Sequence, residues 1–109
     1  MNGSLKVGRV RASHPRTSKV IRVDRTSVLG NPYKMYGEHM RDEVCDNYAV
    51  WLKERIKAKD EVILGALEHI ADLVYNGHDV IITCHCTPKR CHADEIKRVV
   101  ERALVKLKI

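Results

Sequence analysis

Apolar and polar residues alternate over the first part of the chain, and this two-residue period predicts strands. Residues 4–10 predict a short edge strand. The segment "KVIRVDR" at 19–25 predicts a second strand, in which Ile21 and Val23 occupy one face. The polar stretch "RASHPRTS" between them predicts a loop, and the Gly-Asn-Pro sequence at 30–32 interrupts any regular element.

After residue 39 the apolar residues recur every three or four positions, which predicts helices. We expect a first helix at 40–58, a second at 60–75 and a third at 93–108. Asp60 has the side chain of a helix N-cap, and the Asn-Gly pair at 76–77 supplies a stop for the second helix. The third helix carries a basic face opposite its apolar stripe.

Between the second and third helices, "DVIITCHC" at 79–86 is a nearly continuous apolar run, which is typical of a strand covered on both faces. A helical connection between two strands favours their parallel arrangement. The sequence therefore predicts the α/β class: a small layered domain with a few-stranded, mostly parallel sheet flanked by about three helices. We expect one domain over 1–109, with an edge strand and polar loop at 1–18 and the motif-bearing core at 19–109.

This topology has a consequence for function. If the strands are parallel, the loops "RTSVLGNPY" and "CHCTPKRCH" leave the same edge of the sheet. Ligands of open α/β sheets bind at that edge, beyond the carboxyl ends of the strands. The two loops richest in polar motifs are therefore expected to form one site.

Composition narrows the class of partner. The formal charge of +6 over 109 residues favours anionic partners such as nucleotides, nucleic acid or a phosphorylated ligand. No apolar run reaches the roughly 20 residues of a membrane span, and the first residues lack the apolar core of a signal peptide. Four cysteines without an export signal indicate reduced thiols and a cytoplasmic location.

The nine residues "CHCTPKRCH" at 84–92 support three interpretations. The first is zinc, because Cys84, Cys86, Cys91 and His92 provide enough ligands for a tetrahedral ion. Their spacing differs from that of paired Cys-x2-Cys knuckles, and Cys91 and His92 are direct neighbours. Zinc is the one cofactor that the sequence suggests.

The second interpretation is a reactive thiol. Cys91 stands directly before the last helix, where the helix dipole favours the thiolate, and Lys89, Arg90 and His92 would favour it further. Cys91 and His92 are then a candidate nucleophile and its base. The sequence does not indicate a third residue that would orient the histidine. For Cys84 and Cys86, packing as small side chains in the core is the simpler role.

The third interpretation is an anion pocket. On one side the start of the last helix, with Lys89 and Arg90, resembles a helix-terminus site for phosphate. On the other side Arg25, Asn31 and Arg41 would hold the ligand, with Gly30 as a further ligand-binding candidate in the same loop. These residues also have ordinary roles: the cations as solvated charges, and Gly30 and Asn31 in a turn.

Three segments together, "VDRTSVLGNPY", "RDEVCDNYAVWL" and "TCHCTPKRCHADEI", resemble a family of small phage and bacterial proteins known as domain of unknown function 4326. The resemblance covers roughly residues 20–101. It departs at His85, where an aromatic residue is expected, and at Ala93, where glycine is common. The family has no assigned reaction, so the resemblance implies only one shared site for the two loops. The matching positions are Arg25, Leu29, Gly30, Asn31, Pro32, Arg41, Glu43, Tyr48, Leu52, Cys84, Cys86, Pro88, Cys91 and His92.

The sequence thus favours a protein with a pocket for a nucleotide or another phosphorylated small molecule. It leaves open whether the protein is a hydrolase or transferase that depends on the Cys/His pair. One alternative is a zinc-binding domain using the Cys/His cluster. Another is a nucleic-acid-binding accessory protein, of a kind that a phage could encode, that works through the basic last helix. A homodimer would need an interface, which an exposed face with Trp51 or Tyr48 would provide.

Overall fold

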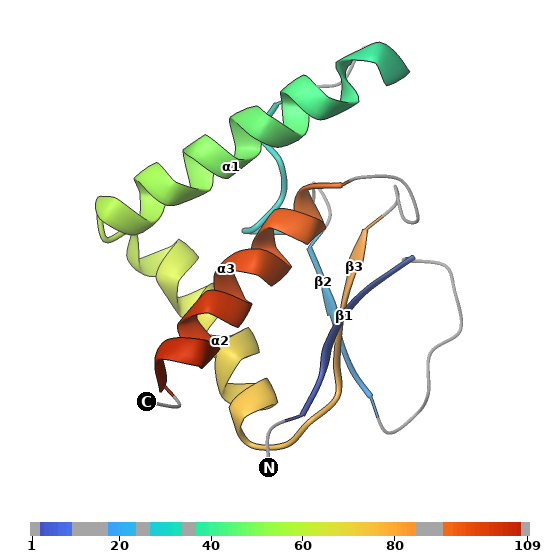
Figure 1. Cartoon of the computed structure of the whole chain (residues 1–109). Coiled ribbons are helices and arrows are strands. Elements are labelled where there is room, and N and C mark those ends of the chain that lie inside the picture. The colour runs from blue at the N-terminus through green and yellow to red at the C-terminus, as the bar shows by residue number, and fades with distance from the viewer. Residues whose placement is uncertain (1–2, 10–17, 24–26, 34–36, 85–90, 108–109) are drawn as a thin grey trace.

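The computed structural model describes residues 3–9, 18–23, 27–33, 37–84 and 91–107, and places strands and helices in the predicted order (Figure 1). The elements are β1 (Leu5–Arg9), β2 (Lys19–Arg22), the 3-10 turn η1 (Glu38–Met40), α1 (Arg41–Lys57), α2 (Glu61–Tyr75), β3 (Val80–Cys84) and α3 (His92–Leu107). The predicted helix boundaries are confirmed to within one residue. The second strand was predicted to extend to residue 25, but it ends at Arg22.

The three strands form a parallel sheet in the order β1-β3-β2. β3 lies in the centre, pairing Ile82 with Val7 on one side and with Ile21 on the other. All five residues of β3 are buried, as its continuous apolar run predicts. The predicted fold class, a small α/β structure with a parallel sheet and three helices, is confirmed.

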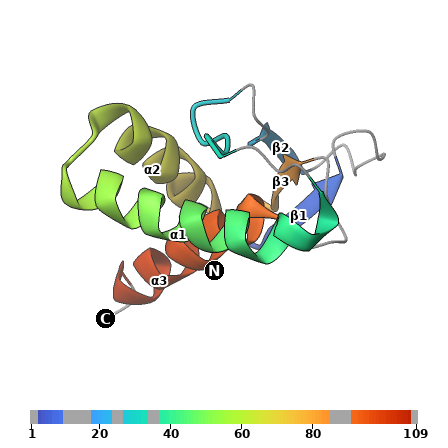
Figure 2. The ribbon, with the colours of Figure 1, turned by 90° about the horizontal axis from the view of Figure 1, so that it is seen from above.

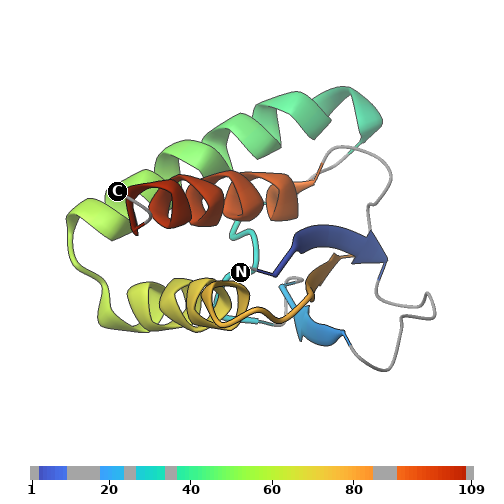
Figure 3. The ribbon, with the colours of Figure 1, turned by 60° about the horizontal axis from the view of Figure 1, so that its bottom comes forward.

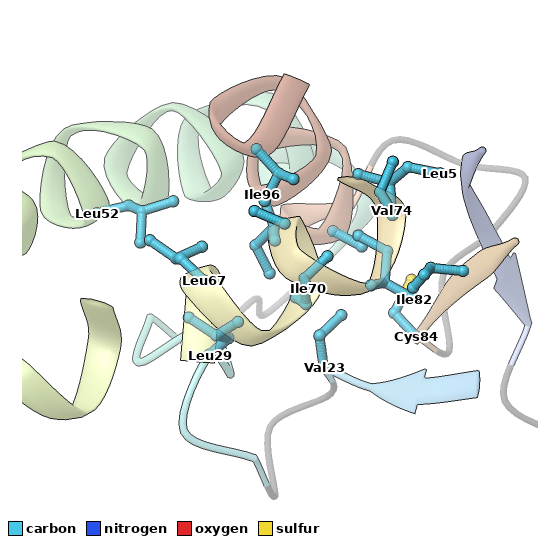
Figure 4. Close-up of a cluster of buried hydrophobic side chains, with 14 of the residues drawn as sticks. Leu5, Val23, Leu29, Leu52, Leu67, Ile70, Val74, Ile82, Cys84 and Ile96 are labelled. Atoms are coloured by element: carbon cyan, nitrogen blue, oxygen red, sulfur yellow. The ribbon is translucent and has the colours of Figure 1, made fainter. Parts of the chain in front are cut away.

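The helices all lie on one side of the sheet, as Figures 1 and 3 show. Side chains from the facing side of the strands and from the helices meet in one hydrophobic cluster (Figure 4). Leu, Ile and Val dominate this cluster, as expected of a chain without phenylalanine. Seen from above, α1 packs across α3 (Figure 2). The other sheet face carries the exposed Val20 and Arg22 of β2, beside the buried Ile81 and Thr83 of β3.

Local chemistry explains where α2 begins and ends. The side chain of Asp60 accepts hydrogen bonds from the amides of Val62 at 3.2 Å and Ile63 at 3.3 Å, which confirms the predicted N-cap. After the helix, Gly77 takes a φ of 94°, a left-handed conformation that glycine adopts without strain. Within the described part of the chain, no helix combines the length and apolarity needed to cross a membrane.

Two glycines give a matched test of this packing. Gly65 lies exposed in α2 with no atom within 4 Å of the position of an added Cβ, so Gly65→Ala is expected to raise the free energy of unfolding by about 0.5–1 kcal/mol. At Gly3 an added Cβ would lie 1.8 Å from the carbonyl oxygen of His78. Gly3→Ala is therefore expected to lower the free energy of unfolding by about 1–3 kcal/mol. Urea denaturation measures both. Equal effects of the two substitutions would contradict the close packing at Gly3.

Candidate functional site

The segment that follows β2 and residues of the second predicted loop lie together at the carboxyl edge of the sheet. Val23 directly follows β2, and its amide donates a hydrogen bond to the carbonyl of Thr83 at 3.0 Å. Cys84 is the last residue of β3, and Cys91 directly precedes α3. Because β2 and β3 are parallel, these chain segments lie on the same edge of the sheet, which confirms the expectation drawn from topology.

Cys91 and His92 form a buried pair. The sulfur of Cys91 lies 3.5 Å from Nδ1 of His92, and the two residues are 1% and 7% exposed. Nε2 of His92 makes a short hydrogen bond with the carbonyl oxygen of Val23. A carbonyl only accepts, so Nε2 carries a proton, and in the neutral ring Nδ1 presents its lone pair to the thiol. The backbone of Val23 is thus the orienting group that the sequence did not reveal.

Cys84 contacts the same thiol. The sulfur atoms of Cys84 and Cys91 are hydrogen bonded at 2.7 Å, and both residues are 1% exposed. The two sulfur atoms are not joined by a disulfide bond in the structure. The expected role of Cys84 as a small core side chain is borne out by its place in the hydrophobic cluster, where it also contacts the sulfur of Cys91.

The start of α3 has its own carboxylates. The amide of Cys91 donates to Oδ2 of Asp94 at 3.1 Å, and the amide of Asp94 donates back to the carbonyl of Cys91 at 3.0 Å. Asp94 and Glu95 stand in the first turn, where negative charge is favoured by the helix dipole. The negative charges of Asp94 and Glu95 therefore offset part of the positive potential of the α3 N-terminus, which was predicted to attract the anion of a ligand.

Tyr48 connects the two loops. Its hydroxyl donates a hydrogen bond of 2.7 Å to the carbonyl of Leu29, and its ring meets that of His92 edge-on, with centroids 5.1 Å apart. Burial raises the pKa of Tyr48 well above its usual value, and the negative charges of Cys91 and Glu95 raise it further. The phenol therefore stays protonated and serves as a donor. Its helical spacing in the sequence indicated a core residue, and nothing there indicated this hydrogen bond.

The loop held by Tyr48 is a pair of tight turns. The amide of Gly30 donates to the carbonyl of Ser27 at 3.0 Å, and Oδ1 of Asn31 accepts from the amide of Tyr33 at 2.8 Å. Asn31 is 6% exposed. Of the two roles predicted for Asn31, the structure shows the one in a turn, and contact with a ligand stays a prediction.

The predicted cations are only partly described. Arg41 is the first residue of α1, and its guanidinium forms two hydrogen bonds with Glu38, at 2.9 Å and 2.7 Å. Its partner in the proposed anion pocket, Arg25, lies outside the described residues, as do Lys89 and Arg90. The predicted anion-binding set therefore stays a prediction.

A metal site does not assemble from the described residues alone. No group of three or more His, Cys, Asp or Glu side chains among them is arranged to hold a metal ion, and the predicted ligand Cys86 lies outside them. The zinc interpretation therefore stays a prediction.

Two further predictions concern surfaces. On α3, Lys97 pairs with Glu101 at 3.4 Å and Arg98 with Glu95 at 3.3 Å, so acidic partners offset part of the basic face. Tyr48 is 0% exposed, because its ring packs into the core, so it is not available for a homodimer interface, which stays a prediction. Trp51 is partly buried against the same cluster.

A cavity of about 90 Å³ lies between α1 and α3. Three basic side chains line it: Lys53 of α1, and Arg98 and Arg102 of α3. The acid Glu95, which is 5% exposed, lines it and also contributes to the electrostatic environment of Tyr48. The sequence had assigned the basic residues of α3 only to a helix face. The cavity is lined by Ala49, Leu52, Lys53, Glu95, Arg98, Val99 and Arg102.

The model of a protein family matches residues 7–102, and that family is described as a domain of unknown function, DUF4326. The match includes every residue of the cluster formed by Val23, Tyr48, Cys84, Cys91 and His92. Comparison with curated proteins and with solved structures gives no significant match.

Proposed function

We propose that this chain, which belongs to the DUF4326 family, binds a nucleotide or another phosphorylated small molecule at the carboxyl edge of its sheet and acts on it through Cys91. The reaction would be a hydrolysis or a group transfer that passes through a covalent intermediate on the thiol. The family carries no assigned reaction, so the proposal depends on the chemistry of the site.

One observation carries the proposal: Cys91, His92 and the carbonyl of Val23 are arranged as nucleophile, base and orienting group. The 3.5 Å between Sγ and Nδ1 allows the imidazole to take the thiol proton, and the bond from Nε2 to Val23 keeps Nδ1 directed at the sulfur. The position of Cys91 immediately before α3 adds the favourable effect of a helix N-terminus on the thiolate.

The steps follow from these positions. Nδ1 of His92 accepts the proton of Cys91, and the thiolate attacks an electrophilic atom of the ligand, forming a bond to sulfur as the bond to the leaving group breaks. The imidazolium gives its proton to the leaving group. Water or a second substrate then displaces the sulfur, with His92 accepting the proton of the incoming nucleophile and returning it to Cys91.

The phosphate of the ligand would be held from both sides of the edge. Arg25, Asn31 and Arg41 are proposed for one side, and Lys89, Arg90 and the amides at the start of α3 for the other. The formal charge of +6 supports an anionic ligand. Binding to nucleic acid remains an alternative for the same basic protein, and a homodimer is compatible with either function.

A covalent-trapping experiment tests the proposal. Purified protein is incubated with nucleoside mono-, di- and triphosphates and sugar phosphates, then denatured and weighed by mass spectrometry. We expect a compound that raises the melting temperature and leaves an adduct on Cys91. The Cys91→Ser variant should form no adduct, and His92→Gln should form it about 10²–10⁴-fold more slowly. Cys45→Ser, which replaces a buried cysteine of α1, is the control and should behave as the wild type.

Two results would count against this function. If no phosphorylated compound changes the melting temperature, the anion pocket is wrong. If a compound binds and is converted equally well by Cys91→Ser, the pocket exists but the thiol takes no part in the reaction.

A further inference from the structure

The contact between Cys84 and Cys91 has a chemistry that the proposed hydrolysis or transfer does not use. We propose that these residues form a reversible dithiol–disulfide pair that reduces small hydroperoxides, with Cys91 as the attacking thiolate and Cys84 as the resolving thiol. The pair shares Cys91 with the proposed function but requires no phosphorylated ligand.

The first argument is distance. The sulfur atoms lie 2.7 Å apart, so bond formation at about 2.05 Å would need an approach of only about 0.7 Å. The residues are seven positions apart and come from different elements, the end of β3 and the start of α3. The fold therefore holds the two thiols together, and no local chain geometry requires them to meet.

The second argument is the asymmetry of the pair. Cys91 has Nδ1 of His92 at 3.5 Å and stands at the N-terminus of α3, and both features favour its thiolate. Cys84 belongs to the same hydrophobic cluster as Cys91, and this environment favours the neutral form of both thiols, but Cys84 ends a strand and does not precede a helix. Peroxide-reducing pairs need this division, since one sulfur must attack and the other must wait for the oxidised product.

The third argument concerns the oxidant. Both cysteines are 1% exposed, so an oxidant of a few atoms needs the smallest opening of the site to reach them. A hydroperoxide has this size. A buried thiolate next to a protonated imidazole also has the proton that the departing oxygen requires.

The reaction balances as two steps. The Cys91 thiolate attacks the terminal oxygen of the hydroperoxide, the O–O bond breaks, and the alcohol leaves with the proton held by His92, so that Cys91 becomes a sulfenic acid. The sulfur of Cys84 then attacks the sulfenic sulfur, and its proton leaves with the hydroxyl group as water. Two thiols and one hydroperoxide thus give one disulfide, one alcohol and one water. An external thiol reductant returns the pair to its starting state by thiol–disulfide exchange.

The test uses hydrogen peroxide and no phosphorylated compound. Reduced protein is exposed to peroxide, blocked with an alkylating reagent and weighed intact. We expect a mass loss of about 2 Da, the two hydrogen atoms of a disulfide, which dithiothreitol reverses. Trypsin cleavage after Lys89 and Arg90 separates Cys84 from Cys91, so a crosslinked pair of peptides identifies the bond.

Variants assign the two roles. Cys84→Ala should stop at the sulfenic acid, which dimedone traps on Cys91, and Cys91→Ser should react at least about tenfold more slowly. Cys84→Ala keeps an apolar side chain in the core, and Cys84→Ser is the second variant if the alanine protein does not fold. Cys45→Ser and Cys86→Ser are the controls and should form the same disulfide as the wild type.

Three results would overturn the pairing: no mass loss, a crosslink that disappears in Cys86→Ser, or equal oxidation of Cys91→Ser. One zinc per chain in native mass spectra would also overturn it, because both thiolates would then be metal ligands. The outcome is separable from that of the proposed function. Peroxide oxidation can succeed where every phosphorylated compound fails to bind, and the reverse is equally measurable.

Discussion

Replacing Ile82 by alanine is expected to lower the free energy of unfolding by about 2–5 kcal/mol. Ile82 is 0% exposed and stands in the middle of the central strand, paired with Val7 of β1 and Ile21 of β2. Its side chain faces the hydrophobic cluster beneath the helices, where removal of three carbons leaves a cavity that close-packed neighbours fill only in part. Urea denaturation followed by circular dichroism measures the change.

Val20→Ala is the matched control. Val20 lies on an edge strand, is 50% exposed, and occupies the sheet face away from the helices, so its truncation is expected to change stability by no more than about 0.5 kcal/mol. Similar losses for the two variants would mean that the outer face of the sheet is buried in solution. The Ile82 variant also bears on function, because Cys84 lies two residues further along the same face of β3.

Tyr48→Phe is expected to lower the free energy of unfolding by about 1–3 kcal/mol at pH 7. The substitution keeps the ring that packs against His92 but removes the hydroxyl, so the buried carbonyl of Leu29 loses its donor. Tyr75→Phe, at a tyrosine that is 50% exposed at the end of α2, is the control and should change stability by less than about 0.5 kcal/mol.

The contribution of Tyr48 to the free energy of unfolding also depends on pH. Whether it grows or falls as the pH rises follows from the raised pKa of the phenol. The folded protein keeps the phenol proton to a higher pH than the unfolded chain does, because burial and then the charges of Cys91 and Glu95 disfavour the phenolate. Its contribution is therefore fully present below pH 10. It is lost as the pH rises above the ordinary tyrosine value, by up to about 1.4 kcal/mol per pH unit.

The stability difference between wild type and Tyr48→Phe should consequently shrink from pH 10 upward. Denaturation series at pH 7, 9, 10 and 11 measure it, and comparison with the variant cancels the titration of all other groups. A difference that stays constant up to pH 11 would show that Tyr48 ionises as readily in the folded protein as in the unfolded chain.

These predictions connect the fold to the site. Ile82 anchors the strand that carries Cys84, and Tyr48 links the loop at 27–33 to the ring of His92. Damage at either position is expected to slow both reactions proposed for Cys91. We therefore expect activity and peroxide oxidation to fall together in Tyr48→Phe and to be unaffected in Tyr75→Phe.

Much of the architecture was predictable from the order of residues. The helical spacing of apolar side chains, the cap at Asp60 and the stop at Gly77 are local features, set by interactions between residues three or four apart. The apolar run of β3 indicated a central strand, and the helical connection between strands indicated parallel pairing. From these two inferences alone, both motif loops were expected at one edge of the sheet.

The partners within the site could not be predicted in this way. The carbonyl that orients His92 belongs to Val23, 69 residues earlier, and a backbone oxygen leaves no mark on the residue type. Cys84 was correctly expected to pack in the core, yet its contact with Cys91 depends on where β3 ends relative to α3. Short-range periodicity establishes which segments become helices or strands. The meeting of distant atoms depends on how those segments pack, because contacts between residues far apart in the chain leave no periodic pattern in the sequence.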